Sequence, residues 1–142
     1  MKQKIILLVE DNPDDVLLTQ RALLENHITH ELKVVQDGVA AMDYLVDAAS
    51  EEEPPALPTV ILLDLKLPQM DGLEVLKKIR AHEKLKRLPV VILTSSKEQQ
   101  DILKSYNLGA NSFFRKPVDF DQFTEAIRQL GLYWLRLNEP PP

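Results

Sequence analysis

The chain of 142 residues contains no cysteine, only four glycines, few aromatic residues and no long apolar run. The absence of cysteine excludes disulfides, thiolate metal sites and a cysteine nucleophile. The four glycines form no phosphate-binding loop, so the sequence does not support nucleotide binding. Because no apolar stretch reaches membrane-spanning length and the first one is too short for a signal peptide, we expect a cytoplasmic protein without a membrane partner.

The excess of acidic over basic residues excludes another class of partner. The formal net charge is −5, and the only basic cluster is Lys84, Lys86 and Arg87. Nucleic-acid binding needs clustered positive charge, so we expect none here. The length and the balance of apolar and charged residues predict one globular domain over residues 1–142, with its core in about 4–137 and no output domain. The proline-rich tail, residues 139–142, is expected to fray.

Short apolar runs alternate with longer segments of helical period. This alternation is typical of βαβ units, and it predicts an α/β fold with a parallel sheet. The predicted strands are Lys4–Val9, Leu32–Val35, Thr59–Leu63, Val90–Leu93 and Ser112–Phe114.

Helix boundaries are marked by capping residues. Asn12 followed by Pro13 predicts the start of the first helix, which should end near Asn26. The next two helices are expected to follow Gly38 and Gly72, and the fourth to follow Ser96. The acidic, proline-rich segment 47–58 is predicted to be a surface loop between the second helix and the third strand.

The last helix is expected to begin near Asp119. It carries a core-facing apolar stripe made of Phe120, Phe123, Ile127, Leu130, Trp134 and Leu137. Leu132, Tyr133 and Leu135 lie off this stripe, so the final turns are apolar nearly all round. Two interpretations stay open, a cap over the edge of the core or a surface for self-association.

Reactive and polar residues end four of the apolar runs. Glu10 and Asp11 follow the first run, Asp64 the third, Thr94 the fourth and Lys116 the fifth. The carboxyl ends of parallel strands share one edge, which is where ligands bind in open α/β sheets. We therefore expect these side chains to converge on one rim.

Three carboxylates on adjacent strands repel one another, and a hard divalent cation relieves that repulsion. Glu10, Asp11 and Asp64 therefore predict a Mg²⁺ site, for which Mn²⁺ can substitute. No histidine or cysteine joins them, which disfavours zinc and copper. The competing interpretation is that the two acids cap the first helix, but Asn12 already supplies that cap.

Asp64 with Lys116 and Thr94 forms a set suited to phosphoryl chemistry. A carboxylate can attack phosphorus and form an aspartyl phosphate, while an ammonium group and a hydroxyl contact the phosphoryl oxygens. Taken singly, Thr94 reads as a strand-end hydroxyl that the backbone satisfies, and Lys116 as a surface lysine. The set in this order favours the chemical interpretation.

The chain resembles the CheY-like response-regulator receiver domains of bacterial two-component signalling from Ile5 to about Leu137. The resemblance is carried by VEDN, LLDLKLPQMDG, LTSS and FFRKP at 9–12, 62–72, 93–96 and 113–117. It implies a flavodoxin-like, doubly wound (βα)5 fold with strand order 2-1-3-4-5, an order for which a receiver is a known example.

The same resemblance implies roles for individual residues. Asp64 would be the phospho-acceptor, and Glu10, Asp11 and the backbone carbonyl of Lys66 would bind Mg²⁺. Thr94 and Lys116 would contact the phosphoryl oxygens, and Phe113 matches the aromatic switch position on the fifth strand. We expect Lys66 and Ser96, which flank the acceptor, to influence the lifetime of the phosphoryl group.

More narrowly, the chain is similar to stand-alone receivers that partner phytochrome-type histidine kinases. The similarity lies in the Asn12-Pro13 start of the first helix, the long loop before the third strand, Leu85–Ser96 and the ending GLYWLRLN. It implies a sensor histidine kinase as partner and a homodimer through the fifth strand and last helix, including Trp134 and Leu137.

The expected function is therefore that of a single-domain response regulator. Phosphorylation of Asp64 would draw Thr94 inward, let Phe113 rotate, and switch the face formed by helix four, strand five and helix five. One alternative is a degenerate scaffold that never takes phosphate. The other is a Mg²⁺-dependent phosphatase, which typically needs an acid where this chain has Lys66.

Overall fold

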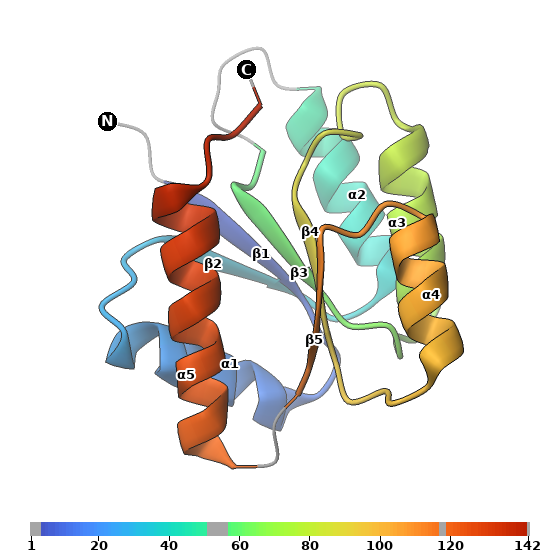
Figure 1. Cartoon of the computed structure of the whole chain (residues 1–142). Coiled ribbons are helices and arrows are strands. Elements are labelled where there is room, and N and C mark those ends of the chain that lie inside the picture. Colours follow the sequence, from blue (N-terminus) through green and yellow to red (C-terminus); the bar gives the residue numbers. More distant parts are fainter. Residues whose placement is uncertain (1–3, 51–56, 117–118, 142) are drawn as a thin grey trace.

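The computed structural model describes residues 4–50, 57–116 and 119–141, in which five strands alternate with five α-helices (Figure 1). The strands are β1 (Ile5–Val9), β2 (Glu31–Val35), β3 (Val60–Leu63), β4 (Val90–Thr94) and β5 (Ser112–Arg115). The helices are α1 (Pro13–Glu25), α2 (Gly38–Ala49), α3 (Gly72–Ala81), α4 (Gln99–Asn107) and α5 (Phe120–Leu132), and α5 continues into a π-helical turn, Tyr133–Leu137.

The strands form one parallel sheet in the order β2-β1-β3-β4-β5, which confirms the predicted flavodoxin-like fold. Each predicted strand is present, and its ends differ by one residue at most. Val9 pairs with Leu63, and Leu63 pairs with Ile92. Because these strands end level with one another, the residues that follow β1 and β3 meet at one rim of the sheet.

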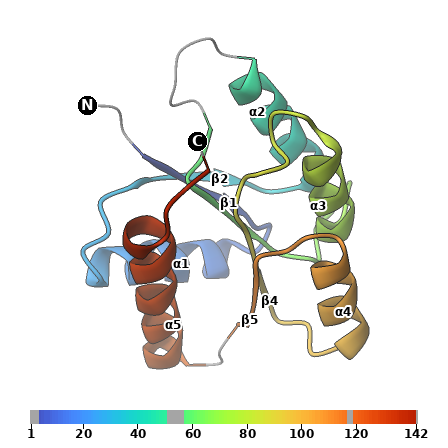
Figure 2. The same ribbon diagram turned by 45° about the horizontal axis from the view of Figure 1, so that its top comes forward.

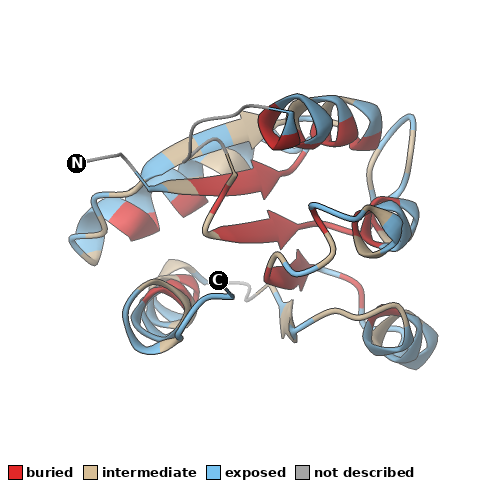
Figure 3. Ribbon diagram, turned by 90° about the horizontal axis from the view of Figure 1, so that it is seen from above, coloured by how far each residue is buried: buried red, intermediate tan, exposed pale blue. Residues whose placement is uncertain are grey.

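Helices cover both faces of the sheet, with α1 and α5 on one side and α2, α3 and α4 on the other (Figures 1 and 2). The central strands are buried between these layers (Figure 3). Successive residues of a strand point to opposite faces. Leu7, Val9, Ile61 and Leu63 therefore pack in one core cluster, and Ile6, Leu8, Val60 and Leu62 in the other. Within the described parts of the chain, no helix has the length and apolar character that a bilayer crossing requires.

The start of α1 follows the predicted capping pattern. The Asn12 side chain accepts hydrogen bonds from the backbone N–H groups of Asp14 and Asp15, at 2.9 and 3.4 Å, and Pro13 is the first helical residue. Asp14 and Asp15 lie in the first turn, where the helix dipole favours negative charge. The cap is therefore supplied by Asn12, which leaves Glu10 and Asp11 for another role.

The predicted loop 47–58 begins too early. Helix α2 runs to Ala49, so residues 47–49 are helical. Ala48 and Ala49 are buried, and Ala49 packs in the core cluster beneath α2, which favours continuation of the helix over a loop. Residues 51–56 of this predicted loop lie outside the described residues, as does Pro117.

The apolar stripe of the last helix is correct only in part. Phe123, Ile127 and Leu130 are buried, but Leu137 is 67% exposed and Leu135, predicted to lie off the stripe, packs against the core. The cause is the π-helical turn, in which the N–H of Asn138 donates to the Tyr133 carbonyl, 2.6 Å away. An i→i+5 turn holds more residues than an α-turn, so side chains beyond it lie on a different face.

Candidate functional site

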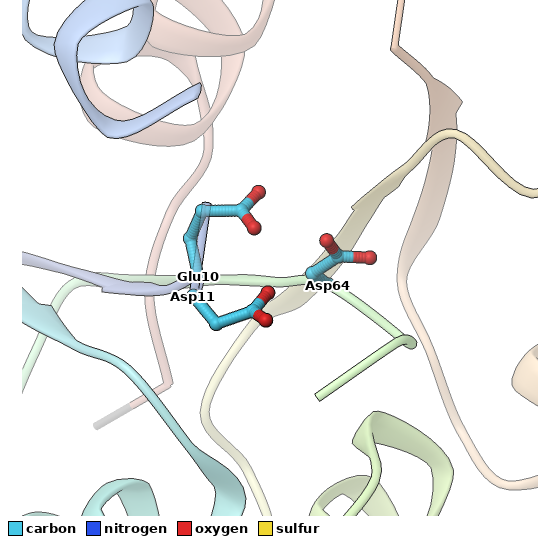
Figure 4. Close-up of side chains that lie close together, drawn as sticks. All are labelled: Glu10, Asp11 and Asp64. Atoms are coloured by element: carbon cyan, nitrogen blue, oxygen red, sulfur yellow. The ribbon is translucent and has the colours of Figure 1, made fainter. Parts of the chain in front are cut away.

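Three acidic side chains gather at the carboxyl ends of β1 and β3. Glu10 and Asp11 follow β1, and Asp64 follows β3 (Figure 4). One carboxylate oxygen from each lies within 4.8 Å of the other two. Glu10 and Asp64 are buried, at 2% and 6% exposure, whereas Asp11 is exposed to solvent. The predicted convergence of these three residues is therefore confirmed.

Backbone hydrogen bonds fix the two buried acids at the rim. The N–H of Asp64 donates to the Val9 carbonyl at 3.1 Å, and the N–H of Glu10 donates to the Val35 carbonyl at 2.9 Å. Gly72, at the start of α3, makes room for this arrangement. A Cβ at that position would lie 2.2 Å from the carbonyl oxygen of Asp64, so only glycine fits without displacing the strand end.

Lys116 extends from beyond β5 into the acidic cluster. Its Nζ donates to Asp64 Oδ2 at 3.0 Å, to Asp15 Oδ2 at 2.8 Å and to Glu10 Oε1. The Lys116 side chain is only 9% exposed, which is not the setting of a surface lysine. The sequence did not predict the contact with Asp15, because an acid in the first turn of α1 is already explained by the helix dipole.

The two buried acids of the cluster differ in the direction of their pKa shifts. Burial raises the pKa of Glu10 to about 7; the Lys116 hydrogen bond opposes this rise, and the negative charge of Asp64 adds to it. Burial also acts to raise the pKa of Asp64, but attraction and hydrogen bonding to Lys116, with hydrogen bonding by Thr94, hold it below its usual value. The Asp64 carboxylate is therefore ionised at neutral pH, while Glu10 holds a proton readily.

Lys116 itself stays charged. Burial acts to lower the pKa of its ammonium group, but hydrogen bonds to Asp15 and Glu10 and the charge of Asp64 raise that pKa above the ordinary value of 10.5. A buried charge persists when it is paired and hydrogen-bonded. One cation thus faces three carboxylates, which leaves the rim with an excess of negative charge.

Thr94 and Ser96 lie beside this cluster at the end of β4. Thr94 is fully buried, and its carbonyl accepts a hydrogen bond from the N–H of Lys116 at 2.8 Å. Ser96 is 8% exposed, and its N–H donates to Thr94 Oγ1 at 3.3 Å. The strand-end interpretation of Thr94 is thus met in part, since its hydroxyl does accept from the backbone.

The loop after β3 lines an open groove next to the acids. Asp11, Leu65, Lys66, Pro68 and Asp101 are among the residues that line it. The N–H of Lys66 donates to Asp64 Oδ1 at 3.3 Å, which holds the loop against the Asp64 carboxylate.

Gln69, in the same loop, has a left-handed backbone with φ of 70°, a conformation that residues other than glycine rarely adopt. No sequence signal had marked this position.

Phe113 of β5 pairs in register with Ile92 of β4 and is half-buried. It packs against the core cluster that lies under α2 and α3.

The acidic residues fit a hard divalent cation. All three side chains offer carboxylate oxygens, the ligand type that Mg²⁺ and Mn²⁺ prefer. The raised pKa of Glu10 reflects a buried carboxylate that lacks sufficient positive charge. A cation at the position between Glu10, Asp11 and Asp64 would supply that charge.

Comparison with known proteins places this geometry in a family. The sequence profile described as the response regulator receiver domain matches residues 6–128. The response regulator Rcp1 of Synechocystis sp. is 41% identical over 132 residues, which cover 93% of this chain and 89% of Rcp1. The crystal structure of the Mn²⁺-bound form of Rcp1 has a TM-score of 0.86 at 40% identity and covers 98% of this chain and 99% of that one.

Two further structures are similar over nearly the whole chain. The phosphorylated cyanobacterial phytochrome response regulator RcpA has a TM-score of 0.88 at 39% identity, with 99% of this chain and 100% of RcpA covered. The bacteriophytochrome response regulator RtBRR is 51% identical with a TM-score of 0.75, and the match covers 99% of this chain and 86% of RtBRR.

The parallel sheet and the acidic rim are those of a phospho-acceptor signalling protein. The chain belongs to the response regulator receiver family of two-component signalling, and its structure and sequence are close to those of phytochrome-associated response regulators. The family predicted from the sequence is therefore confirmed.

Proposed function

We propose that a sensor histidine kinase, of the phytochrome type, phosphorylates Asp64 in a Mg²⁺-dependent reaction. Phosphorylation then switches the face formed by α4, β5 and α5 for partner binding, dimerisation or onward transfer of the phosphoryl group. One observation carries this proposal: the Asp64 carboxylate, ionised and almost fully buried, lies 3.0 Å from the Lys116 ammonium and beside two further acids.

Asp64 has the properties of the nucleophile. A carboxylate oxygen of Asp64 forms a bond to phosphorus while the bond between phosphorus and the kinase histidine nitrogen breaks. The electron pair of the broken bond stays on that nitrogen. The pKa of Asp64 is held below its usual value, so the carboxylate needs no base to remove a proton first.

Glu10, Asp11 and the backbone carbonyl of Lys66 would hold the cation. Mg²⁺ held there would neutralise negative charge on the carboxylates and on the transferred group, which is the chemistry that divalent ions supply in phosphoryl-transfer sites. The oxygen donors within 4.8 Å of one another and the groove beside Lys66 support this ligand set. The Mn²⁺-bound form of Rcp1 supports a divalent cation in this family.

Lys116 and Thr94 would contact the phosphoryl oxygens. Lys116 already faces Asp64 and holds its positive charge, so it can stabilise negative charge on the transferred group without reorganisation. Thr94 reaches the same place from the end of β4. Lys66 and Ser96 lie on either side of the acceptor and would set how readily water reaches the aspartyl phosphate.

The switch would couple Thr94 to Phe113. The transferred group adds negative charge and acceptor oxygens at Asp64, which attract the Thr94 hydroxyl. Phe113 lies on the neighbouring strand and is only half-buried, so its ring has room to change its packing when Thr94 moves. Such bistable elements couple two sites by about 1–3 kcal/mol.

The last helix supplies the surface for a homodimer. Leu132, Tyr133 and Leu137 are exposed, and the half-buried Trp134 packs edge-on against Tyr133 with 4.9 Å between ring centroids. Exposed apolar side chains gathered on one element are typical of an interaction surface. This observation favours self-association through β5 and the last helix over a simple cap on the core.

Phosphotransfer tests the kinase part of the proposal. A phytochrome-type histidine kinase, autophosphorylated with labelled ATP and freed of nucleotide, is mixed with the chain in Mg²⁺. We expect label to move from the kinase to the wild-type chain and not to Asp64→Asn. The kinase's own regulator serves as the control, and transfer to that regulator without transfer to this chain would contradict the proposed partner.

A further inference from the structure

A hydrogen bond ties the loop after β4 to helix α4. Ser96 Oγ donates to Asp101 Oδ2 at 2.6 Å, and the N–H of Glu98 donates to Ser96 Oγ at 3.3 Å. A hydroxyl bonded to a carboxylate at this distance forms one of the stronger hydrogen bonds in proteins. A serine hydroxyl has a single proton, so the Ser96 proton is committed to Asp101.

The other side of Ser96 faces Thr94. The N–H of Ser96 donates to Thr94 Oγ1 at 3.3 Å, and both residues are buried. Because the Thr94 oxygen accepts from Ser96, the Thr94 proton remains free for an acceptor elsewhere. Thr94 ends β4 and Asp64 follows β3, which pairs with β4 in parallel, so the two residues lie at the same edge of the sheet and the free proton can serve a group on Asp64.

Asp101 is itself held firmly on α4. Its N–H donates to the Glu98 carbonyl at 3.1 Å, and its own carbonyl accepts from Ser105 Oγ at 2.7 Å, where Ser105 is fully buried. An acid in the first turn of a helix is often there for the dipole alone. Here its carboxylate instead turns back to the loop and lines the groove shared with Asp11 and Lys66.

We propose that Asp101 is a positioning residue, which acts through Ser96 to hold the Thr94 hydroxyl ready for the phosphoryl group on Asp64. The inference rests on the proposed phosphorylation of Asp64 and adds a second element, α4, to the acceptor site. Positioned donors accelerate phosphoryl transfer because they need no reorganisation during the reaction. Loss of the carboxylate frees the Ser96 hydroxyl and loosens the orientation of Thr94.

The test is the rate at which acetyl phosphate phosphorylates the chain in saturating Mg²⁺, followed by intact mass. We expect Asp101→Ala to react about fivefold more slowly, a factor that one net hydrogen bond supports. Asp101→Asn keeps an acceptor oxygen without the charge and should stay within about twofold of wild type. Glu98→Ala removes a charge from the same helix end, where its side chain makes no capping hydrogen bond, and should leave the rate unchanged.

A second background separates positioning from a general structural effect. In a Thr94→Ala chain, Asp101→Ala should change the rate by less than about twofold, because residues that act through one another are not additive. An equal loss in both backgrounds, an Asp101→Asn rate as low as that of Asp101→Ala, or an unchanged Asp101→Ala rate would overturn the inference alone. No adduct on the wild-type chain would instead overturn the proposed function, and the inference with it.

Discussion

Glu10 is the residue on which the electrostatics of the rim depend most. It is almost completely buried, it contacts Lys116, and its pKa is raised to about 7 by burial and by Asp64. Protons and a divalent cation therefore compete for the same carboxylate at pH values near neutrality. Acidification should weaken cation binding at this rim.

The raised pKa has a consequence for stability without metal. The Glu10 pKa is about 7 in the folded chain and 4.5 as its ordinary value. Between those values the folded state holds more protons, so the free energy of unfolding should fall as pH rises from about 4.5 to about 7 and level off above. We expect a total loss on the order of 3 kcal/mol from this group.

Urea unfolding in EDTA across pH 4.5–8 measures this effect, with Glu10→Gln as the comparison. Every other titratable residue is present in both proteins, so the difference between the two curves isolates Glu10. Gln mimics the protonated carboxyl, so that difference should be smallest near pH 4.5, grow as the wild type loses stability, and stay constant above about pH 7. Parallel curves at every pH would show that Glu10 keeps an ordinary pKa.

Residue types at the rim could be predicted from the sequence, but their full set of contacts could not. Apolar runs that end in Glu10, Asp11, Asp64 and Lys116 identify the site because parallel strands end at a common edge. The roles of Asp15 and Asp101 escaped notice. Each is an acid in the first turn of a helix, where the dipole gives a sufficient local explanation.

At the scale of elements, Arg80 connects α3 to the start of β5. Its guanidinium donates to the carbonyls of Gly109, Lys86 and Leu88, and to Asn111 Oδ1, at 2.7–3.0 Å. Gly109 has φ of 99°, and a Cβ there would lie 2.9 Å from Arg80 Nε. The two positions are therefore fitted to one another, and the end of α4 is anchored to α3.

Loss of this anchor should destabilise the fold. Arg80→Met leaves the carbonyls of Lys86, Leu88 and Gly109 without their donor, and we expect a loss of about 2–4 kcal/mol in the free energy of unfolding. Urea unfolding gives the value. Arg128→Met is the matched control, because Arg128 pairs with the exposed Glu125 on α5, and the variant should barely shift the urea midpoint. Equal midpoints for the two variants would contradict the anchor.

The end of the last helix shows where periodicity fails as a guide. The 3.6-residue pattern placed Leu137 in the core, but the π-helical turn over Tyr133–Leu137 moves it to the surface. An i→i+5 hydrogen bond has no distinct composition, so the sequence did not indicate it. Leu137 therefore takes the exposed place predicted for Leu135, beside the exposed Leu132 and Tyr133.

For the whole molecule, the topology could be predicted because alternating strands and helices allow few arrangements.

The exposed apolar end of the last helix bears on how copies of the chain assemble. We expect the chain to form a homodimer through this surface, and Leu137→Asp to convert it to a monomer in sedimentation velocity. Leu24→Asp, at a 75% exposed position on α1, should leave the dimer intact. A wild-type monomer at all concentrations would contradict this surface.

The acceptor role of Asp64 is tested most directly by intact mass after incubation with acetyl phosphate, with and without Mg²⁺. We expect one phosphoryl adduct on the wild-type chain, present only with Mg²⁺ and absent from Asp64→Asn. An adduct that persists in Asp64→Asn would place the acceptor elsewhere. No adduct under any condition would leave a phosphate-independent scaffold that acts through the last helix.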